Sequence, residues 1–349
     1  MGLVQFLQVD EFGAFLGKHS ERVIVTKKKE KLVQAPLLHL ESVLISNQGI
    51  SISSDVIREC TERGIPIYFV TTSGTPYASL YSAGLTGTVA TRRAQYEAYQ
   101  TTRGLSLVIA IGMGKLQNQS TLLKYMGKYR KSADPDRFKE LRLLSAEVLD
   151  QALELEKILK RPEFLTGTLR VDDVREEILG IEGRGAKKYW QAVKLVLPEK
   201  YNFSGRVRRG AKDPVNAALN YGYGILYGQI ERAIVLAGLD PFAGFLHSDR
   251  PGKPSLTLDV VEEYRPVIVD RVIFGLVNKN ACLDQDAEGL LTKETRRLIA
   301  DKVMERLESM VSYEKKRYPL RSVIQMQSRH IATFLRGDRA SYQPILMKW

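Results

Sequence analysis

The chain has 349 residues, of which 44% are hydrophobic and 26% are charged, a composition typical of a soluble protein with two compact units. No run of 18 apolar residues, no leader-like segment after Met1 and no C-x-x-C pattern occurs, so we expect a cytoplasmic protein without a membrane partner, a disulfide framework or a cysteine zinc site. The formal net charge of +12 favours a polyanionic partner over a small neutral metabolite.

Residues 1–88 are predicted to form a small β-rich domain that ends in a linker. Short β-branched or aromatic runs predict meander-like strands at residues 4–9, 13–17, 22–26 and 43–46. A capped helix over residues 56–63 leads into an apolar strand over 65–71 and a turn at 73–76. Residues 81–88 contain two glycines among hydroxyl side chains, so they are predicted to be the linker.

Residues 89–349 are predicted to form a helical domain, because apolar residues recur there every three to four positions. The predicted fold class is α+β, with a small β-rich N-terminal domain followed by a larger all-helical C-terminal domain. Residues 1–80 contain eight basic and eight acidic side chains, so the whole charge surplus lies in residues 81–349. Residues 124–131 interleave cations with aromatic rings, a pattern that holds a nucleic-acid backbone or forms a solvated helix end.

Two glycine-rich motifs in the helical part do not fit nucleotide-binding loops. Residues 112–115 end in Gly-Lys, but Ile109 and Leu116 stand where a phosphate loop needs glycine and a hydroxyl side chain. Residues 180–185 have glycine-rich spacing but lie between helical patterns instead of after a strand. Four histidines without a Gly-x-Ser-x-Gly sequence give little support for a serine hydrolase.

The most informative stretch is residues 213–271. Asp213 and Pro214 begin a predicted helix that ends near Gly238. Interior glycines weaken a helix, so three of them predict that another helix or a ligand backbone approaches closely; they are Gly222, Gly224 and Gly228. The apolar segment that follows ends at His247, immediately before a turn-prone basic loop.

The next predicted helix carries three carboxylates, Asp259, Glu262 and Glu263, which we expect on one helix face. Like charges gathered in this way are tolerated when they are solvated or when a cation binds. Carboxylates together with an imidazole such as that of His247 are typical ligands of Mg²⁺ or Mn²⁺ in phosphodiester chemistry. The alternative is a solvated helix face beside a core histidine, and spacing does not choose between Glu262 and Glu263.

Five ordered motifs resemble one known family. They are Gly-Ile-Glu-Gly at 180–183, Leu-Asn-Tyr-Gly-Tyr at 219–223, Gly-Leu-Asp-Pro at 238–241, Gly-Phe-Leu-His at 244–247, and the run from Pro-Gly-Lys-Pro-Ser-Leu to Tyr-Arg-Pro at 251–266. Residues 9–16 and 64–70 extend the likeness into the N-terminal part, so it covers nearly the whole chain. The sequence resembles the CRISPR-associated integrase of spacer acquisition, the first CRISPR-associated protein, often called Cas one.

The resemblance implies a metal-dependent DNA endonuclease and integrase that inserts protospacer DNA into a CRISPR array, a step of antiviral defence. It implies that Glu182, His247 and Glu262 are catalytic and bind Mg²⁺ or Mn²⁺, with Asp259 either supporting a ligand or serving as an alternative ligand. The implied partners are DNA, a small second adaptation subunit, and a second copy of the chain in a homodimer formed through the N-terminal domain.

Basic residues near these motifs are candidate phosphate contacts for the DNA. They are Arg184, Lys187, Lys188, Arg206, Arg208, Arg209, Lys212, Arg250 and Lys253. Two other functions stay open. One is a general metal-dependent nuclease without integration, and the other is a non-catalytic nucleic-acid-binding scaffold whose charge alone holds its partner.

Overall fold

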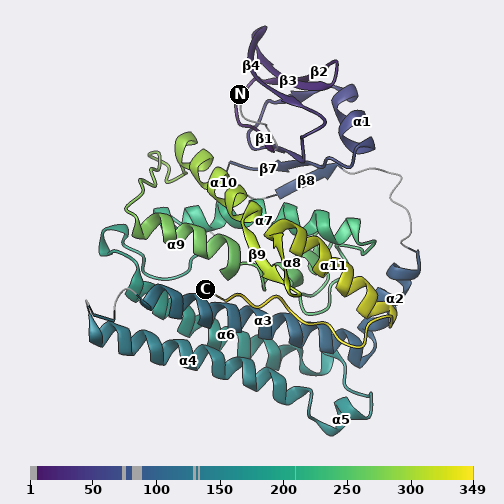
Figure 1. The fold of residues 1–349 in the computed structure, drawn as a ribbon, viewed down its shortest axis with the longest axis vertical. Helices are drawn as coiled ribbons and strands as arrows, with labels where there is room; N and C mark the ends of the chain where they lie inside the picture. The colour runs from purple at the N-terminus through teal and green to yellow at the C-terminus, as the bar shows by residue number, and fades with distance from the viewer. Residues whose placement is uncertain are drawn as a thin grey trace.

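The computed structural model describes residues 6–72, 76–80, 89–128, 131–132, 134–208 and 210–348. Figure 1 shows a small N-terminal unit of strands above a larger unit of helices. Buried apolar side chains of the described residues form two clusters, one from residues 7–67 and one from residues 98–347. The α+β class is confirmed. The predicted linker at 81–88 lies outside the described residues, so the division into 1–88 and 89–349 stays a prediction.

The first N-terminal sheet has the strand order β1–β5–β7–β8. Strands β1 (Phe6–Val9), β5 (Ser42–Ile45) and β7 (Ile67–Val70) run parallel, and β8 (Pro76–Leu80) pairs antiparallel with β7. Parallel neighbours need long connections. The connections here contain the other sheet and helix α1 (Ser54–Glu62).

The second sheet has the order β4–β3–β2–β6. Strands β2 (Phe15–His19), β3 (Arg22–Lys27) and β4 (Glu30–Pro36) form an antiparallel meander, and β6 (Ser51–Ile52) pairs parallel with β2. The meander prediction is therefore right for β2 and β3 and wrong for β1 and β5, which pair parallel, and the apolar strand predicted at 65–71 is confirmed as β7. The sequence does not predict β4, β6 or β8, because β4 begins with exposed charged residues, β6 has two residues, and β8 begins at the proline of an expected turn.

The C-terminal part is mostly helical. Its helices are α2 (Val89–Tyr99), α3 (Thr102–Gly127), α4 (Pro135–Ile158), α5 (Pro162–Leu165), α6 (Val171–Val196), α7 (Pro214–Leu236), α8 (Ser255–Val261), α9 (Arg271–Asn278), α10 (Lys293–Glu308) and α11 (Leu320–Arg336), with the short 3₁₀ turn η2 (Glu199–Tyr201) and the π-helical turn η3 (Pro266–Asp270). A hairpin of β9 (Met310–Tyr313) and β10 (Lys316–Pro319) departs from the predicted all-helical domain. None of the helices in the described part of the chain combines the length and apolar character that a bilayer crossing requires.

Glycines allow helices to approach closely at two places near the site. A Cβ atom at Gly185 on α6 would lie 2.5 Å from Leu116 Cδ2 on α3, and one at Gly222 on α7 would lie 2.7 Å from Val269 Cγ1 on η3. The predicted approach of another helix to the glycines of α7 is thus confirmed at Gly222. Both motifs that resembled nucleotide loops lie inside helices, residues 112–115 in α3 and residues 180–185 in α6.

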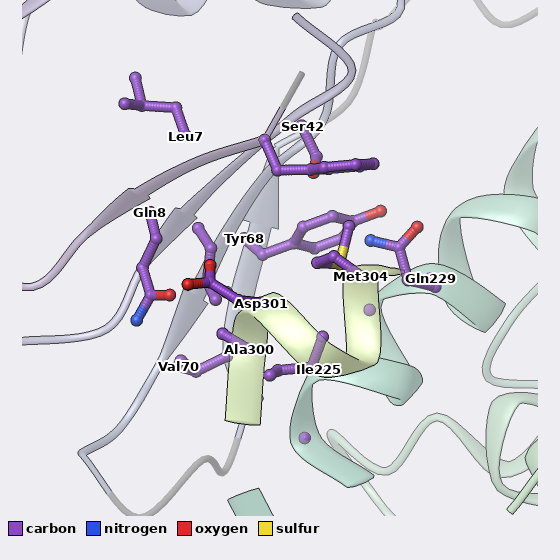
Figure 2. A pocket seen from close by; sticks show the side chains of 14 residues that line it. Leu7, Gln8, Ser42, Tyr68, Val70, Ile225, Gln229, Ala300, Asp301 and Met304 are labelled. Atoms are coloured by element: carbon purple, nitrogen blue, oxygen red, sulfur yellow. The ribbon is translucent and has the colours of Figure 1, made fainter. Parts of the chain in front are cut away.

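The two units meet where β1, β5 and β7 face α7 and α10. A small cavity of about 60 Å³ lies at this junction, and Figure 2 shows Tyr68, Ile225 and Met304 among the side chains that line it. The Tyr68 ring packs over Gly228, where an added Cβ would lie 3.1 Å from it. A hydrogen bond of 3.1 Å from Gln8 Nε2 to the Tyr221 hydroxyl also joins the units. Ion pairs of Lys293 with Glu11 and of Arg321 with Glu41 join them too, so the contact combines apolar packing with polar ties.

Candidate active site

A cavity of about 770 Å³, lined by charged and aromatic as well as aliphatic side chains, opens among residues of α3, α6, α7 and α8 and of neighbouring segments. His247 and Glu262, two of the predicted catalytic residues, line it. Ala186 and Trp190 of α6 line it as well. Glu182 lies one turn before Ala186, and residues spaced by four share a helix face, so Glu182 belongs to the side of α6 that borders the cavity.

Asp259 holds His247 in place. Its carboxylate accepts hydrogen bonds from the backbone N–H groups of Phe245, Leu246 and His247 at 2.6, 3.1 and 3.0 Å. Asp259 Oδ1 also lies 2.7 Å from His247 Nδ1. A carboxylate only accepts, so the proton of this contact belongs to Nδ1 and the lone pair of the ring to Nε2. The aspartate thus supports the histidine from behind, the arrangement that orients metal-binding imidazoles.

Two carboxylates from distant helices share one ammonium group. Lys115 on α3 places its Nζ 2.8 Å from Glu262 Oε2 and 3.5 Å from Glu182 Oε1. Arg265 Nη1 binds the other oxygen of Glu262 at 2.5 Å. The side chains of Lys115, Glu182 and Glu262 are 12%, 10% and 7% exposed, so water contributes little to balancing these charges. The site is a buried network in which each carboxylate depends on its cation.

Burial and the charges of this network together shift the pKa values of its members. Burial alone would raise the pKa of the Glu262 carboxyl, but Arg265 and Lys115 outweigh burial and lower it to about 2. Burial raises the pKa of Glu182, and the charge of Glu262 adds to this while Lys115 opposes it. Burial would lower the pKa of Lys115, yet Glu182 and Glu262 together raise it. Glu262 and Lys115 are therefore ionised at neutral pH.

Glu263 faces away from the cavity, so the expectation that all three carboxylates of this segment share one face is wrong. Its Oε1 accepts a hydrogen bond of 2.8 Å from the Tyr342 hydroxyl, and the residue is fully buried. The physical reason is the end of α8. The N–H groups of Glu262 and Tyr264 donate to carbonyls only three residues back. This tighter turn rotates the following side chains away from regular α-helical positions.

Nine candidate DNA contacts were predicted, and the structure separates them. Arg206, Arg208, Lys212 and Lys253 line the cavity. Arg184 and Lys188 instead contact α4, through Gln151 Oε1 at 3.1 Å and Glu147 Oε2 at 2.7 Å. Lys187 and Arg250 are exposed and do not line the cavity, and Arg209 lies outside the described residues.

Lys115 and Arg265 are site residues that the sequence-based site prediction did not include. The signal for Lys115 was its position as a lone cation in the middle of the long apolar helix α3, where burial without a partner carboxylate is unfavourable. Arg265 stands beside the predicted glutamates. Its guanidinium lies over the rings of Tyr223 and Tyr227 at 4.9 and 5.6 Å, which adds cation–π contacts to its ion pair.

A buried aspartate, Asp270, also lines the cavity. Asp270 accepts hydrogen bonds from the hydroxyl groups of Tyr189 at 2.6 Å and Tyr223 at 2.5 Å. Burial raises the pKa of Asp270 to about 6, although the two tyrosine donors oppose the shift. Tyr223 connects this aspartate to Arg206, whose guanidinium lies 5.3 Å from the centre of the same ring.

The donor atoms around the cavity are those that Mg²⁺ and Mn²⁺ prefer, two carboxylates and one imidazole nitrogen. Within the described residues, no three His, Cys, Asp or Glu side chains are gathered closely enough to hold a metal ion. The Lys115 ammonium occupies the place between Glu182 and Glu262. A cation thus bridges the two carboxylates here, and the site matches a divalent ion in the type of its donor atoms.

A family model and individual relatives of this chain all belong to one protein family. A family model described as CRISPR associated protein Cas1 matches residues 7–305. The CRISPR-associated endonuclease Cas1 1 of Archaeoglobus fulgidus is 36% identical over 98% of this chain and 99% of its own. The protein of the same name from Francisella tularensis subsp. novicida is 31% identical over 99% of this chain and 100% of its own.

Solved structures share the fold. A casposase bound to integration product superposes with a TM-score of 0.81 at 21% identity, covering 97% of this chain and 92% of that chain. A Cas6-RT-Cas1–Cas2 complex gives a TM-score of 0.74 at 20% identity, covering 99% of this chain and 36% of that chain. At these identities, the likeness concerns the fold.

Proposed function

Because the chain belongs to the Cas1 family of CRISPR-associated proteins, we propose that it is a metal-dependent DNA endonuclease and integrase of spacer acquisition. The proposal rests on one observation above all. Glu182 and Glu262, far apart in sequence, meet at the Lys115 ammonium, and Glu262 lines a cavity with basic side chains together with His247. The relatives named as endonucleases and the casposase neighbour support the same class of activity.

In the proposed reaction, the 3′-hydroxyl oxygen of a protospacer end attacks a phosphodiester of the CRISPR repeat. A new P–O bond forms while the original P–O bond of the repeat breaks; the attacking hydroxyl gives up its proton to solvent, and the leaving oxygen takes up a proton as a free hydroxyl. Water in place of the protospacer hydroxyl gives a nick. Mg²⁺ or Mn²⁺ bound by Glu182, His247 and Glu262 supplies Lewis-acid activation of the phosphate and charge neutralisation.

The chain's own residues supply positioning. Asp259 keeps the lone pair of His247 on Nε2, and Arg265 keeps Glu262 ionised. Arg206, Arg208, Lys212 and Lys253 hold phosphates of the DNA at the cavity, which brings the scissile bond to the carboxylates.

Two protein partners follow from the same family. A homodimer formed through residues 1–80 is consistent with their zero formal net charge, which removes one electrostatic obstacle to self-association. A small second adaptation subunit is supported by the neighbour that is a complex containing Cas1 and Cas2. Sedimentation of the full chain at micromolar concentration tests for the homodimer. A clean monomer would count against the dimer.

Strand transfer tests the proposed activity. The protein is incubated with a short duplex and a supercoiled plasmid that carries CRISPR repeats, in Mn²⁺, Mg²⁺ or chelator. We expect joined products only with metal, and their loss in His247→Ala and Glu262→Ala, with Lys187→Ala as the exposed control. Joining that is undiminished in both alanine variants sinks the proposed site.

The products also separate the alternatives. A general nuclease nicks the plasmid without joining the duplex to it. A non-catalytic scaffold gives neither product under any metal condition and binds DNA equally well in chelator and in the alanine variants.

A further inference from the structure

The last described residues of the chain form an extended segment that packs against α3. Residues 341–348 have neither helical nor strand structure, and Figure 1 shows the chain end running beside α3 after it leaves α11. Tyr342, Ile345 and Met347 are buried, whereas Gln343, Leu346 and Lys348 are exposed. The buried side of this segment is therefore part of the core. We call residues 341–348 the C-terminal strap.

Asn118 joins the strap to the turn that carries Glu262. Its Nδ2 group donates to the carbonyl of Glu263 at 3.1 Å and to the carbonyl of Ile345 at 2.8 Å. Its Oδ1 accepts from the Met347 N–H at 2.9 Å. Asn118 is fully buried on α3, so it uses both donor hydrogens and its acceptor to connect three segments.

A second tie lies on the other side of the same turn. The Tyr342 hydroxyl donates to Glu263 Oε1 at 2.8 Å, and both residues are buried. Gln327 on α11 donates to the backbone carbonyl of Gln343 at 2.9 Å, which holds the strap in register. Pro344 lies so close to Gly114 that an added Cβ there would be 2.5 Å from the Pro344 Cβ.

These ties lie next to the proposed catalytic groups in the sequence. Glu263 follows Glu262 directly, and Asn118 and Gly114 flank Lys115 on α3. The helical hydrogen bonds are irregular here, because the N–H groups of Glu262 and Tyr264 donate three residues back while that of Arg265 donates four residues back to Val261. Buried polar networks of this kind select one arrangement of the segments that they join.

We propose that the C-terminal strap positions the catalytic site, because Asn118 and Tyr342 fasten the turn at Glu263 and thereby place Glu262 against Lys115 and the metal. The assignment of Glu262 as a metal ligand rests on the proposed function, whereas the fastening of the turn does not. Asn118 and Tyr342 are positioning residues, since neither lines the cavity.

The first measurement does not depend on metal or activity. Hydrogen–deuterium exchange of the full chain is followed in chelator for peptides that span residues 256–265. We expect faster exchange there in Asn118→Ala and in Tyr342→Phe, because local opening of the turn costs less free energy without its ties. The matched control is Gln343→Ala, since the strap uses the backbone carbonyl of this exposed residue and not its side chain to reach α11.

The second measurement is Mn²⁺ affinity, read from the electron paramagnetic resonance signal of free Mn²⁺. Loss of groups that support ligands weakens metal binding by about 10- to 100-fold, and we expect this range for Asn118→Ala. DNA binding in chelator should stay within about twofold of the unsubstituted protein, since the cationic side chains of the cavity are unchanged.

The outcomes separate the two proposals. Unchanged exchange of residues 256–265 in both variants overturns the proposal that the strap fastens the turn, whatever the activity of the variants. Faster exchange with unchanged Mn²⁺ affinity overturns its role in placing Glu262. If the unsubstituted protein binds no Mn²⁺ and joins no DNA, the proposed function fails, and the exchange result still decides whether the strap fastens the turn.

Discussion

Replacing Lys115 with methionine tests the charge balance of the site. Methionine keeps much of the volume of the lysine stem and removes the ammonium that binds Glu182 and Glu262. Arg265 still pairs with Glu262, so the main loss falls on Glu182, for which Lys115 is the cation at 3.5 Å. Removing one member of a buried ion pair costs about 3–5 kcal/mol, because the remaining charge stays buried. We expect a fall in Tm of about 10 °C at pH 8 in chelator.

The pH dependence of this loss has a definite sign. Burial already raises the pKa of Glu182, and loss of Lys115 raises it further. At lower pH, Glu182 takes up a proton in the variant and the uncompensated charge disappears. The difference in Tm between variant and unsubstituted protein should therefore shrink from pH 8 to pH 5. Differential scanning fluorimetry at both pH values measures it.

Although Lys115→Met lowers the Tm in chelator, we expect it to increase the gain in Tm that Mn²⁺ gives. Under the proposed function, Mn²⁺ would compete in the unsubstituted protein with the Lys115 ammonium for the same carboxylate oxygens. In Lys115→Met this competitor is absent, so saturating Mn²⁺ should raise the Tm of the variant by more than it raises that of the unsubstituted protein. The control is Lys188→Met, which removes a lysine whose pair with Glu147 is partly solvated, and for which we expect a loss below about 1 kcal/mol. A fall in Tm for Lys115→Met no larger than for the control, or equal Mn²⁺ responses, would refute the reasoning.

Three further predictions concern other parts of the cavity. Asp259→Asn should weaken Mn²⁺ binding and strand transfer by about 10- to 100-fold, because the amide nitrogen cannot accept from the N–H groups of residues 245–247 that the two carboxylate oxygens hold; unchanged Mn²⁺ affinity would contradict this. Burial raises the pKa of Asp270 to about 6 from its ordinary 3.8, so the contribution of this residue to folding stability falls as pH rises between about 4 and 6, by about 3 kcal/mol. Urea unfolding should show that Asp270→Asn lacks this fall. Arg208→Ala should reduce the salt dependence of DNA binding by about one unit of slope, whereas Lys187→Ala should leave it nearly unchanged.

The family and the broad architecture could be predicted from the sequence, because they depend on patterns local to each segment. Alternating and helical periodicities separate the strands before residue 80 from the helices after residue 89. The N-cap at Asp213 accepts from the Asn216 N–H as expected. Parallel pairing of β1, β5 and β7 was missed, since a strand's own residues do not specify its neighbours.

The site shows the same division. Family likeness points to Glu182, His247 and Glu262, whereas spacing alone leaves Glu262 and Glu263 open, and neither decides the role of Asp259. Those choices depend on tertiary structure. Asp259 lies against the His247 loop, while the turn that ends α8 sends Glu263 to Tyr342, nearly eighty residues later in the chain. Lys115 becomes part of the site only because α3 packs against α6 and reaches the turn after α8. No local pattern encodes contacts made between segments so far apart, and it is these contacts that assign each buried charge its partner.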